Sequence, residues 1–180
     1  MLESLPLGTA SAVEAGRWSL DPDRSSVAFR VPRRFGLARI TGRFTRSEGM
    51  LDARDPEALA LTLSADPASF ETGSTRRDAH LRSDDGFGAE RHPRLWLAST
   101  AVALDGGCLT VAGELHAAGR RIAITSEGTL RRHAGHVELA LSAPVDPRAL
   151  GMTRSPLGRV RGPAELVVRG RLVRVPAARS

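Results

Sequence analysis

The sequence predicts an all-β protein: one elongated antiparallel β-barrel of about eight strands, with a short helical insertion near residues 75–91. Two observations predict this fold. From Trp18 onward, apolar residues mostly alternate with polar or small ones, which is typical of strands with one buried face. Turn signals separate the alternating segments at close to hairpin spacing. About eight antiparallel strands can close into a barrel with room for one elongated ligand.

The alternation defines one domain over residues 17–174. The preceding residues, 1–16, are small, polar and unpatterned, so we expect a flexible N-terminal arm, and we expect residues 175–180 to fray. The predicted strands centre on residues 27–31, 40–44, 59–63, 95–97, 109–115, 122–124, 137–141 and 166–172. The turns between them include Asp105-Gly106-Gly107, Ala118-Gly119, Ala134-Gly135 and Asp146-Pro147.

The helical insertion follows the third predicted strand. Gly73 ends the strand pattern, and Ser74 or Thr75 can cap a helix. Asp78 falls in the first turn, where a carboxylate meets the positive end of the helix dipole. We expect a second helical turn around residues 85–91, ending before His92-Pro93.

Composition excludes several kinds of chemistry. The 180 residues contain no Lys, Asn, Gln or Tyr, which excludes a Schiff-base lysine, a Walker lysine, a tyrosine acid and a side-chain amide oxyanion hole. Cys108 is the single cysteine, so neither an intrachain disulfide nor a thiolate-rich zinc site can form. There is no G-x-S-x-G nucleophile motif. We therefore predict no catalytic residues and a protein that is not an enzyme.

The net charge of +6 is carried by arginine. The arginines are spread along the chain and the aromatic fraction is 4%, whereas nucleic-acid platforms interleave stacking aromatics with basic residues. We expect no nucleic-acid partner. No apolar run approaches the ~20 residues of a membrane-spanning helix, so we expect no stable membrane insertion. The N-terminus lacks the features of a signal peptide, which predicts a cytoplasmic location.

The histidines do not predict a metal site. The chain has five, and His133 and His136 are separated by a glycine-containing turn, so their rings need not converge. No HExxH motif is present. We expect no metal and no cofactor.

Three segments together resemble a known family. The run TGSTRRDAHLRSDDGFGAERHPRLWLAST, residues 72–100, is similar to the signature of the YceI-like family of lipocalin-like, lipid-binding proteins. Residues 18–31 resemble the first strand of that family, and Gly42-Arg43-Phe44 resembles its glycine-x-phenylalanine element. The resemblance covers about residues 17–174. It implies a lipocalin-like barrel that stores, transports or sequesters a polyisoprenoid, such as an isoprenoid quinone, or another long-chain amphiphile.

The resemblance suggests an apolar lumen that holds a lipid. The same alternation of apolar and polar residues also fits a barrel filled by its own side chains. Each buried methylene contributes about 0.8 kcal/mol, so an apolar lumen could hold an aliphatic tail well. The expected lumen residues are Phe29, Val31, Ile40, Phe44, Leu61, Phe70, Phe87, Trp96 and Met152.

The head group is expected near the helical insertion. Arg76, Arg77 and His80 are the candidates, because the planar fork of arginine suits phosphate. The structural alternative, which we favour, has Asp78 cap the helix and pair with an arginine while His80 packs under the loop. Asp78 and Leu81 are then signature residues of the fold.

Two other functions stay open at this point. A histidine and a carboxylate in the pocket could isomerise or cyclise a hydrophobic substrate. An exposed arginine surface could instead bind an acidic partner. Long edge strands and the family resemblance also predict a possible homodimer.

Overall fold

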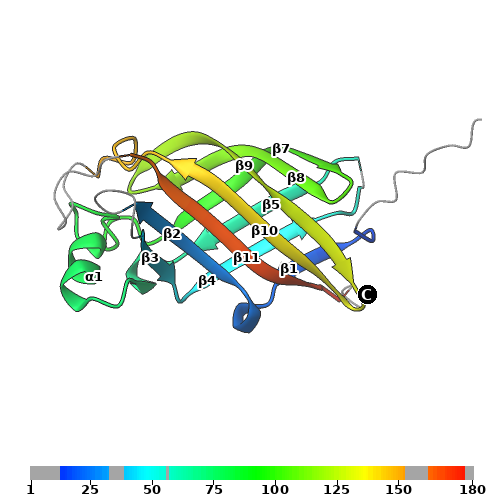
Figure 1. Ribbon diagram of the computed structural model, residues 1–180, viewed down its shortest axis with the longest axis horizontal. Helices are drawn as coiled ribbons and strands as arrows, with labels where there is room; N and C mark the ends of the chain where they lie inside the picture. The colour runs from blue at the N-terminus through cyan, green and yellow to red at the C-terminus, as the bar shows by residue number, and fades with distance from the viewer. Residues whose placement is uncertain (1–12, 33–38, 56, 153–161, 177–180) are drawn as a thin grey trace, which may run out of the picture.

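A computed structural model of the protein describes residues 13–32, 39–55, 57–152 and 162–176. Figure 1 shows an elongated barrel of long, tilted strands with a single labelled helix, α1, at one end. The β9–β10 turn and the C-terminus lie at the opposite end. These two ends are called the helix end and the hairpin end.

Eight long strands make the barrel, and three of them are interrupted. Each interrupted strand consists of two labelled segments. The pairs of segments are β1 (Arg17–Leu20) and β2 (Ser26–Pro32), β3 (Arg39–Phe44) and β4 (Ser47–Asp52), and β5 (Ala60–Ala65) and β6 (Phe70–Glu71). The 3-10 turn η1 (Pro22–Arg24) separates β1 from β2, and η3 (Pro67–Ser69) separates β5 from β6. The other five are β7 (Leu95–Asp105), β8 (Cys108–Ala117), β9 (Arg120–His133), β10 (His136–Val145) and β11 (Ala164–Arg174).

The ring closes through β11. It pairs antiparallel with β1, where Leu20 is opposite Leu172, and then with β2, where Ser26 is opposite Arg169. Around the ring the order is β1, β4, β5, β7, β8, β9, β10 and β11. The predicted antiparallel barrel of about eight strands is therefore confirmed. The homodimer prediction rested on long edge strands and on the family resemblance. Closure of the ring pairs the strands that would have been edges and removes the first argument, so the homodimer stays an untested prediction.

The core is the barrel interior. Along β8 and β10 buried residues alternate with more exposed ones, as the sequence predicts. The side chains with almost no exposed surface come from strands all around the ring: Leu51, Leu61, Leu109, Leu115, Leu130, Val137 and Leu172. Among the described residues, no helix is both long and apolar enough to cross a bilayer.

The insertion is a helix followed by turns. Helix α1 (Thr75–Arg82) begins where the sequence predicts. The second predicted helical turn does not extend into a helix: residues 84–87 and 89–91 form hydrogen-bonded turns, and the bond from His92 N to Gly88 O at 2.8 Å is the i→i+4 bond of one helical turn. These turns fold back onto α1, because Phe87 N donates to Leu81 O at 2.7 Å and Gly88 N donates to Ser83 O at 2.8 Å. A Cβ on Gly86 would lie 2.2 Å from Leu81 O, so only glycine permits this approach.

Residues 13–16, expected in a loose arm, contact the hairpin end of the barrel instead. Val13 is 3% exposed, and the indole Nε1 of Trp18 donates to Glu14 O at 3.0 Å. Glu14 also forms an ion pair with Arg132. On the C-terminal side, Val175 N donates to the backbone of β1 at 2.8 Å. The rest of the predicted arm, 1–12, and the tail residues 177–180 lie outside the described residues.

Candidate functional site

An apolar pocket of about 100 Å³ lies inside the barrel at the helix end. Strands β2, β3, β6, β10 and β11 contribute to its wall, together with α1 and the turns that follow it. Six of the nine predicted lumen residues line it: Phe29, Val31, Ile40, Phe70, Phe87 and Met152. The aliphatic part of the lining also includes Leu81, Val145, Leu150 and Ala164.

Four phenylalanines form the pocket floor. Phe29, Phe70 and Phe87 line the pocket, and Phe44, which does not, packs against all three with ring centroids 4.8–6.0 Å apart. They come from β2, β6, the turns after α1 and β3, so distant parts of the sequence meet here. Gly42 makes the packing possible, since a Cβ there would lie 2.1 Å from Phe70 Cζ. This close approach explains the glycine in the glycine-x-phenylalanine element.

Below the phenylalanine floor, side chains fill the described interior. A cavity of about 10 Å³ lies among Leu63, Leu97, Leu141, Leu166 and Val168. That is no more than the roughly 10–15 Å³ needed for one water molecule. The alternating pattern fitted both an open lumen and a barrel filled by its own side chains. The barrel is filled in this region, and the open pocket lies at the helix end.

The charged part of the lining comes from the insertion. Arg77 is half-buried and Asp85 is exposed, and both line the pocket together with Thr72. Arg77 Nε donates to Thr72 Oγ1 at 2.9 Å, and Thr72 Oγ1 donates to Asp78 Oδ1 at 2.6 Å. The same carboxylate oxygen accepts a bond from Thr72 N at 2.8 Å. This chain of hydrogen bonds orients the guanidinium of Arg77 at the pocket.

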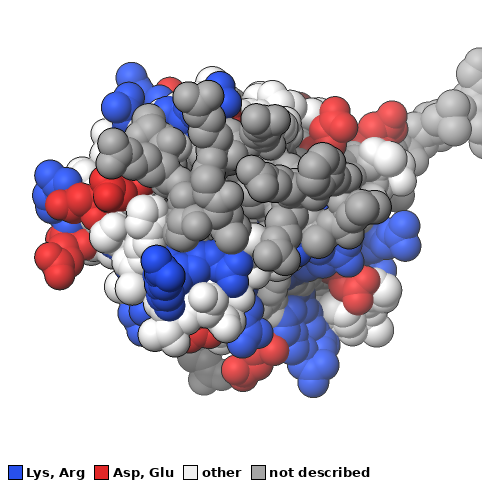
Figure 2. Space-filling view, turned by 60° about the vertical axis from the view of Figure 1, so that its left-hand side comes forward, with Lys and Arg blue, Asp and Glu red and all other residues white. Residues whose placement is uncertain are grey.

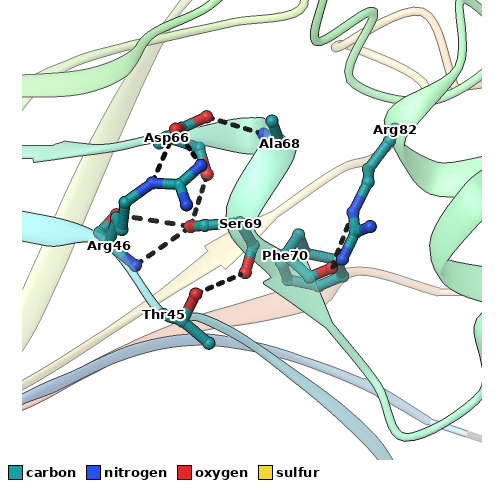
Figure 3. A network of polar contacts seen from close by, with 7 residues as sticks. All are labelled: Thr45, Arg46, Asp66, Ala68, Ser69, Phe70 and Arg82. Carbon is teal, nitrogen blue, oxygen red and sulfur yellow. Dashed lines mark hydrogen bonds and ion pairs between the residues drawn. The ribbon is translucent and has the colours of Figure 1, made fainter.

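The position of β6 is set by a polar network outside the pocket. Figure 3 shows Ser69 at its centre: Thr45 Oγ1 donates to Ser69 O, Arg46 N donates to Ser69 Oγ, and Ser69 Oγ donates to Asp66 O. Arg82 donates to Phe70 O with Nε at 3.1 Å and with Nη2 at 2.6 Å, which ties α1 to β6. The hydrogen bond from Arg46 holds the pKa of Asp66 below its usual range. The network therefore holds Phe70 and α1 in place around the pocket.

The structure places the remaining predicted site residues elsewhere. Leu61 is buried in the core but does not line the pocket. The lumen position predicted for Trp96 is wrong: it is 37% exposed and stacks on His116, with centroids 3.7 Å apart. Its neighbours Leu95 and Leu97 face inward, so alternation directs the indole outward.

Of the head-group candidates, only Arg77 reaches the pocket. Arg76 is exposed and His80 is half-buried, and neither lines it. Asp78 is buried, as suits a signature residue, but its carboxylate accepts hydrogen bonds from Thr72 N and Thr72 Oγ1, and Ser74 is the N-cap residue of α1. The expectation that Asp78 caps the helix is therefore corrected. Leu81, the other signature residue, lines the pocket.

Charges of both signs surround the helix end. Among the described residues, Figure 2 shows arginine side chains interspersed with carboxylates on this face.

Comparison with known proteins shows which family the chain belongs to. The family model for the YceI-like domain matches residues 18–169. The chain belongs to the YceI-like family. Protein YceI of Escherichia coli O6:H1 is 30% identical over 131 residues, which cover 71% of this chain and 68% of that protein.

Two solved structures share the barrel of this YceI-like protein. Burkholderia cenocepacia BcnA superposes with a TM-score of 0.76 at 18% identity, covering 87% of this chain and 99% of BcnA. A polyisoprenoid binding domain from Saccharophagus degradans, implicated in plant cell wall breakdown, gives a TM-score of 0.66 at 16% identity and covers 88% and 98%. At these identities the likeness concerns the fold.

Proposed function

We propose that this YceI-like protein binds an isoprenoid or similar amphiphile without covalent chemistry, and stores, carries or sequesters it. The observation that carries the proposal is the apolar pocket beneath α1, whose lining is aliphatic and aromatic except for a few polar groups at the insertion. A cavity of this composition suits a hydrocarbon chain with a polar end. The Saccharophagus degradans neighbour, described as a polyisoprenoid binding domain, supports the choice of ligand class.

The head group would sit beside Arg77. Its Nε is engaged by Thr72, and Thr72 is engaged by Asp78, so the guanidinium is already oriented before a ligand binds. An oriented arginine loses less conformational freedom on binding and suits the oxygens of a phosphate or carboxylate. An anionic or strongly polar head group is therefore favoured over a simple hydrocarbon.

The tail segment held by the pocket would be short. A cavity of about 150 Å³ holds one benzene, so a pocket of about 100 Å³ corresponds to roughly four carbons, close to one isoprene unit. The phenylalanine floor lies behind them. Any longer tail must either leave by the pocket opening or displace the floor.

The alternative of an isomerase or cyclase depended on His80, which does not line the pocket. The ionisable residues among the described lining are Arg77 and Asp85. A binding role uses Arg77 as the head-group contact and needs no proton transfer.

Native mass spectrometry of the purified protein, followed by organic extraction and lipid identification, tests the proposal. We expect a mass excess that dissociates into a prenyl or acyl species. An apo mass, with no uptake of added farnesyl phosphate or farnesol, would contradict lipid binding. Arg77→Met should weaken binding of the phosphate more than of the alcohol, whereas the control Arg76→Met should alter neither, because Arg76 does not line the pocket.

A further inference from the structure

The β9–β10 turn brings together three possible metal ligands that the sequence did not predict to meet. His133 and His136 flank the two-residue turn and are direct cross-strand partners. Their rings stack at a centroid distance of 4.8 Å and an interplanar angle of 9°. The expectation that these rings need not converge is therefore corrected. The cluster lies at the hairpin end, away from the pocket (Figure 1).

Glu138 supplies an oxygen donor to the same cluster. His133 Nε2 lies 3.1 Å from Glu138 Oε2, and His136 Nε2 lies 4.0 Å from Glu138 Oε1. One ligand atom from each of the three residues can be chosen so that all lie within 4.8 Å of one another. We propose that His133, His136 and Glu138 bind a divalent transition-metal ion, of the class of Zn²⁺, Ni²⁺ or Cu²⁺.

The distances suit such an ion once the stacked rings rotate out of parallel, because the lone pair of an imidazole nitrogen lies in the plane of its ring. With metal–ligand bonds of about 2.0–2.2 Å, the donors of a tetrahedral site lie roughly 3.3 Å apart. The two histidine–carboxylate separations, 3.1 and 4.0 Å, bracket that value. His133 and Glu138 are exposed and His136 is half-buried, so both strands present the donors to solvent and an ion can reach them.

The tautomer of His136 can favour binding. Its Nδ1 lies 3.4 Å from Ala134 O, so a proton on Nδ1 faces a carbonyl acceptor and leaves the lone pair on Nε2. Metal-binding histidines commonly use their second ring nitrogen in this way, which fixes the ring orientation.

Neighbouring charges select against hard cations. Arg131 on β9 and Arg171 on β11 are the cross-strand partners of Glu138, so positive charge stands on both sides of the carboxylate. Mg²⁺ and Ca²⁺ prefer oxygen ligands and gain mainly electrostatic energy, which these arginines reduce. Imidazole nitrogen suits Zn²⁺, Ni²⁺ and Cu²⁺, which form stronger bonds to it.

Calorimetric titration of the full chain, prepared without a histidine tag, tests the site with Zn²⁺, Cu²⁺ and Mg²⁺. We expect one Cu²⁺ or Zn²⁺ per chain and no heat with Mg²⁺. His133→Ala and His136→Ala should each weaken binding by at least about tenfold, as loss of a supporting group alone can do. Electron paramagnetic resonance of the Cu²⁺ complex should show two coordinated imidazole nitrogens.

His116→Ala is the matched control, because His116 also lies beside a surface glutamate, Glu114, but without a second histidine. It should leave affinity unchanged. Equal losses in all three histidine variants, or Cu²⁺ spectra unchanged by His133→Ala, would show adventitious surface binding and overturn the proposal. Circular dichroism of each variant checks that the fold is retained.

Discussion

Lengthening the tail of a bound ligand should raise its affinity only until the pocket at the helix end is full. Each methylene moved from water into the pocket contributes about 0.8 kcal/mol, or roughly a fourfold gain in affinity. Because a cavity of about 150 Å³ holds one benzene, the gain in a pocket of about 100 Å³ should end after roughly four tail carbons. A series of straight-chain carboxylates from two to sixteen carbons, measured by calorimetry, should therefore show a steep rise followed by a plateau.

Phe87→Ala should move the end of that rise to longer chains. Phe87 lines the pocket and contacts the other three phenylalanines of the floor, so its loss joins new space to the pocket. The substitution should cost about 3–5 kcal/mol of folding free energy, the usual range for a buried phenylalanine. Leu130→Ala is the control: it removes a buried side chain of β9, opposite Leu139 of β10, with a cost of about 2–5 kcal/mol, and should leave the plateau where it was.

The result that would refute this reasoning is a wild-type affinity that keeps rising about fourfold per methylene from ten to sixteen carbons. Such a series would mean that the phenylalanine floor opens at little cost and that the filled interior is displaced by the ligand. A plateau that Leu130→Ala shifts as far as Phe87→Ala would also contradict it, because loss of stability alone would then explain the change.

Three further predictions concern stability. Asp78→Ala removes the acceptor of two hydrogen bonds, each worth about 1.5–3 kcal/mol to a charged group, so the free energy of unfolding in urea should fall by at least ~2 kcal/mol. Gly42→Ala drives a methyl group into the phenylalanine floor and should cost about 1–3 kcal/mol in the same assay. The hydrogen bond from Arg54 lowers the pKa of Asp52 from 3.8 to about 2, so its stabilisation is present above pH 3.8 and lost as the pH falls toward 2. Asp52→Asn should flatten the fall of the urea midpoint over that range, and an unchanged pH profile would contradict the assignment.

The strands were predictable because burial on one face imposes a period of two. The same period of two predicts that Trp96 points outward, because Leu95 and Leu97 on either side of it face the core. Trp96 was wrongly assigned to the lumen because the assignment followed its large aromatic side chain instead of its place in the strand. The alternation in the sequence was enough to predict its outward position.

The sequence was also sufficient to predict that His133 and His136 lie side by side. Residues that flank a two-residue hairpin turn are cross-strand partners by construction, and their Cβ atoms lie about 4.5–5.5 Å apart. The prediction failed because Ala134-Gly135 was treated as a break between strands, whereas the geometry of the turn itself fixes the pair.

The extent of the pocket could not be predicted from the sequence. A filled barrel and an open one need the same alternation, and what separates them here is how four rings pack together. The contact from Arg82 to Phe70 O crosses 12 residues and depends on the fold already being in place. The role of Arg77, in contrast to Arg76, depends on which face of α1 meets the pocket.

The two proposed sites lie at opposite ends of one strand and should act independently. β10 begins at His136 in the hairpin cluster and ends at Val145 in the pocket wall. Nine steps of about 3.3 Å place these residues roughly 30 Å apart, with filled core between them. Substitutions at such a distance, with no shared partner, usually combine additively. Arg77→Met combined with His133→Ala should therefore lose head-group and metal affinity by the same factors as the single variants, and a departure from additivity would show that the barrel couples its ends.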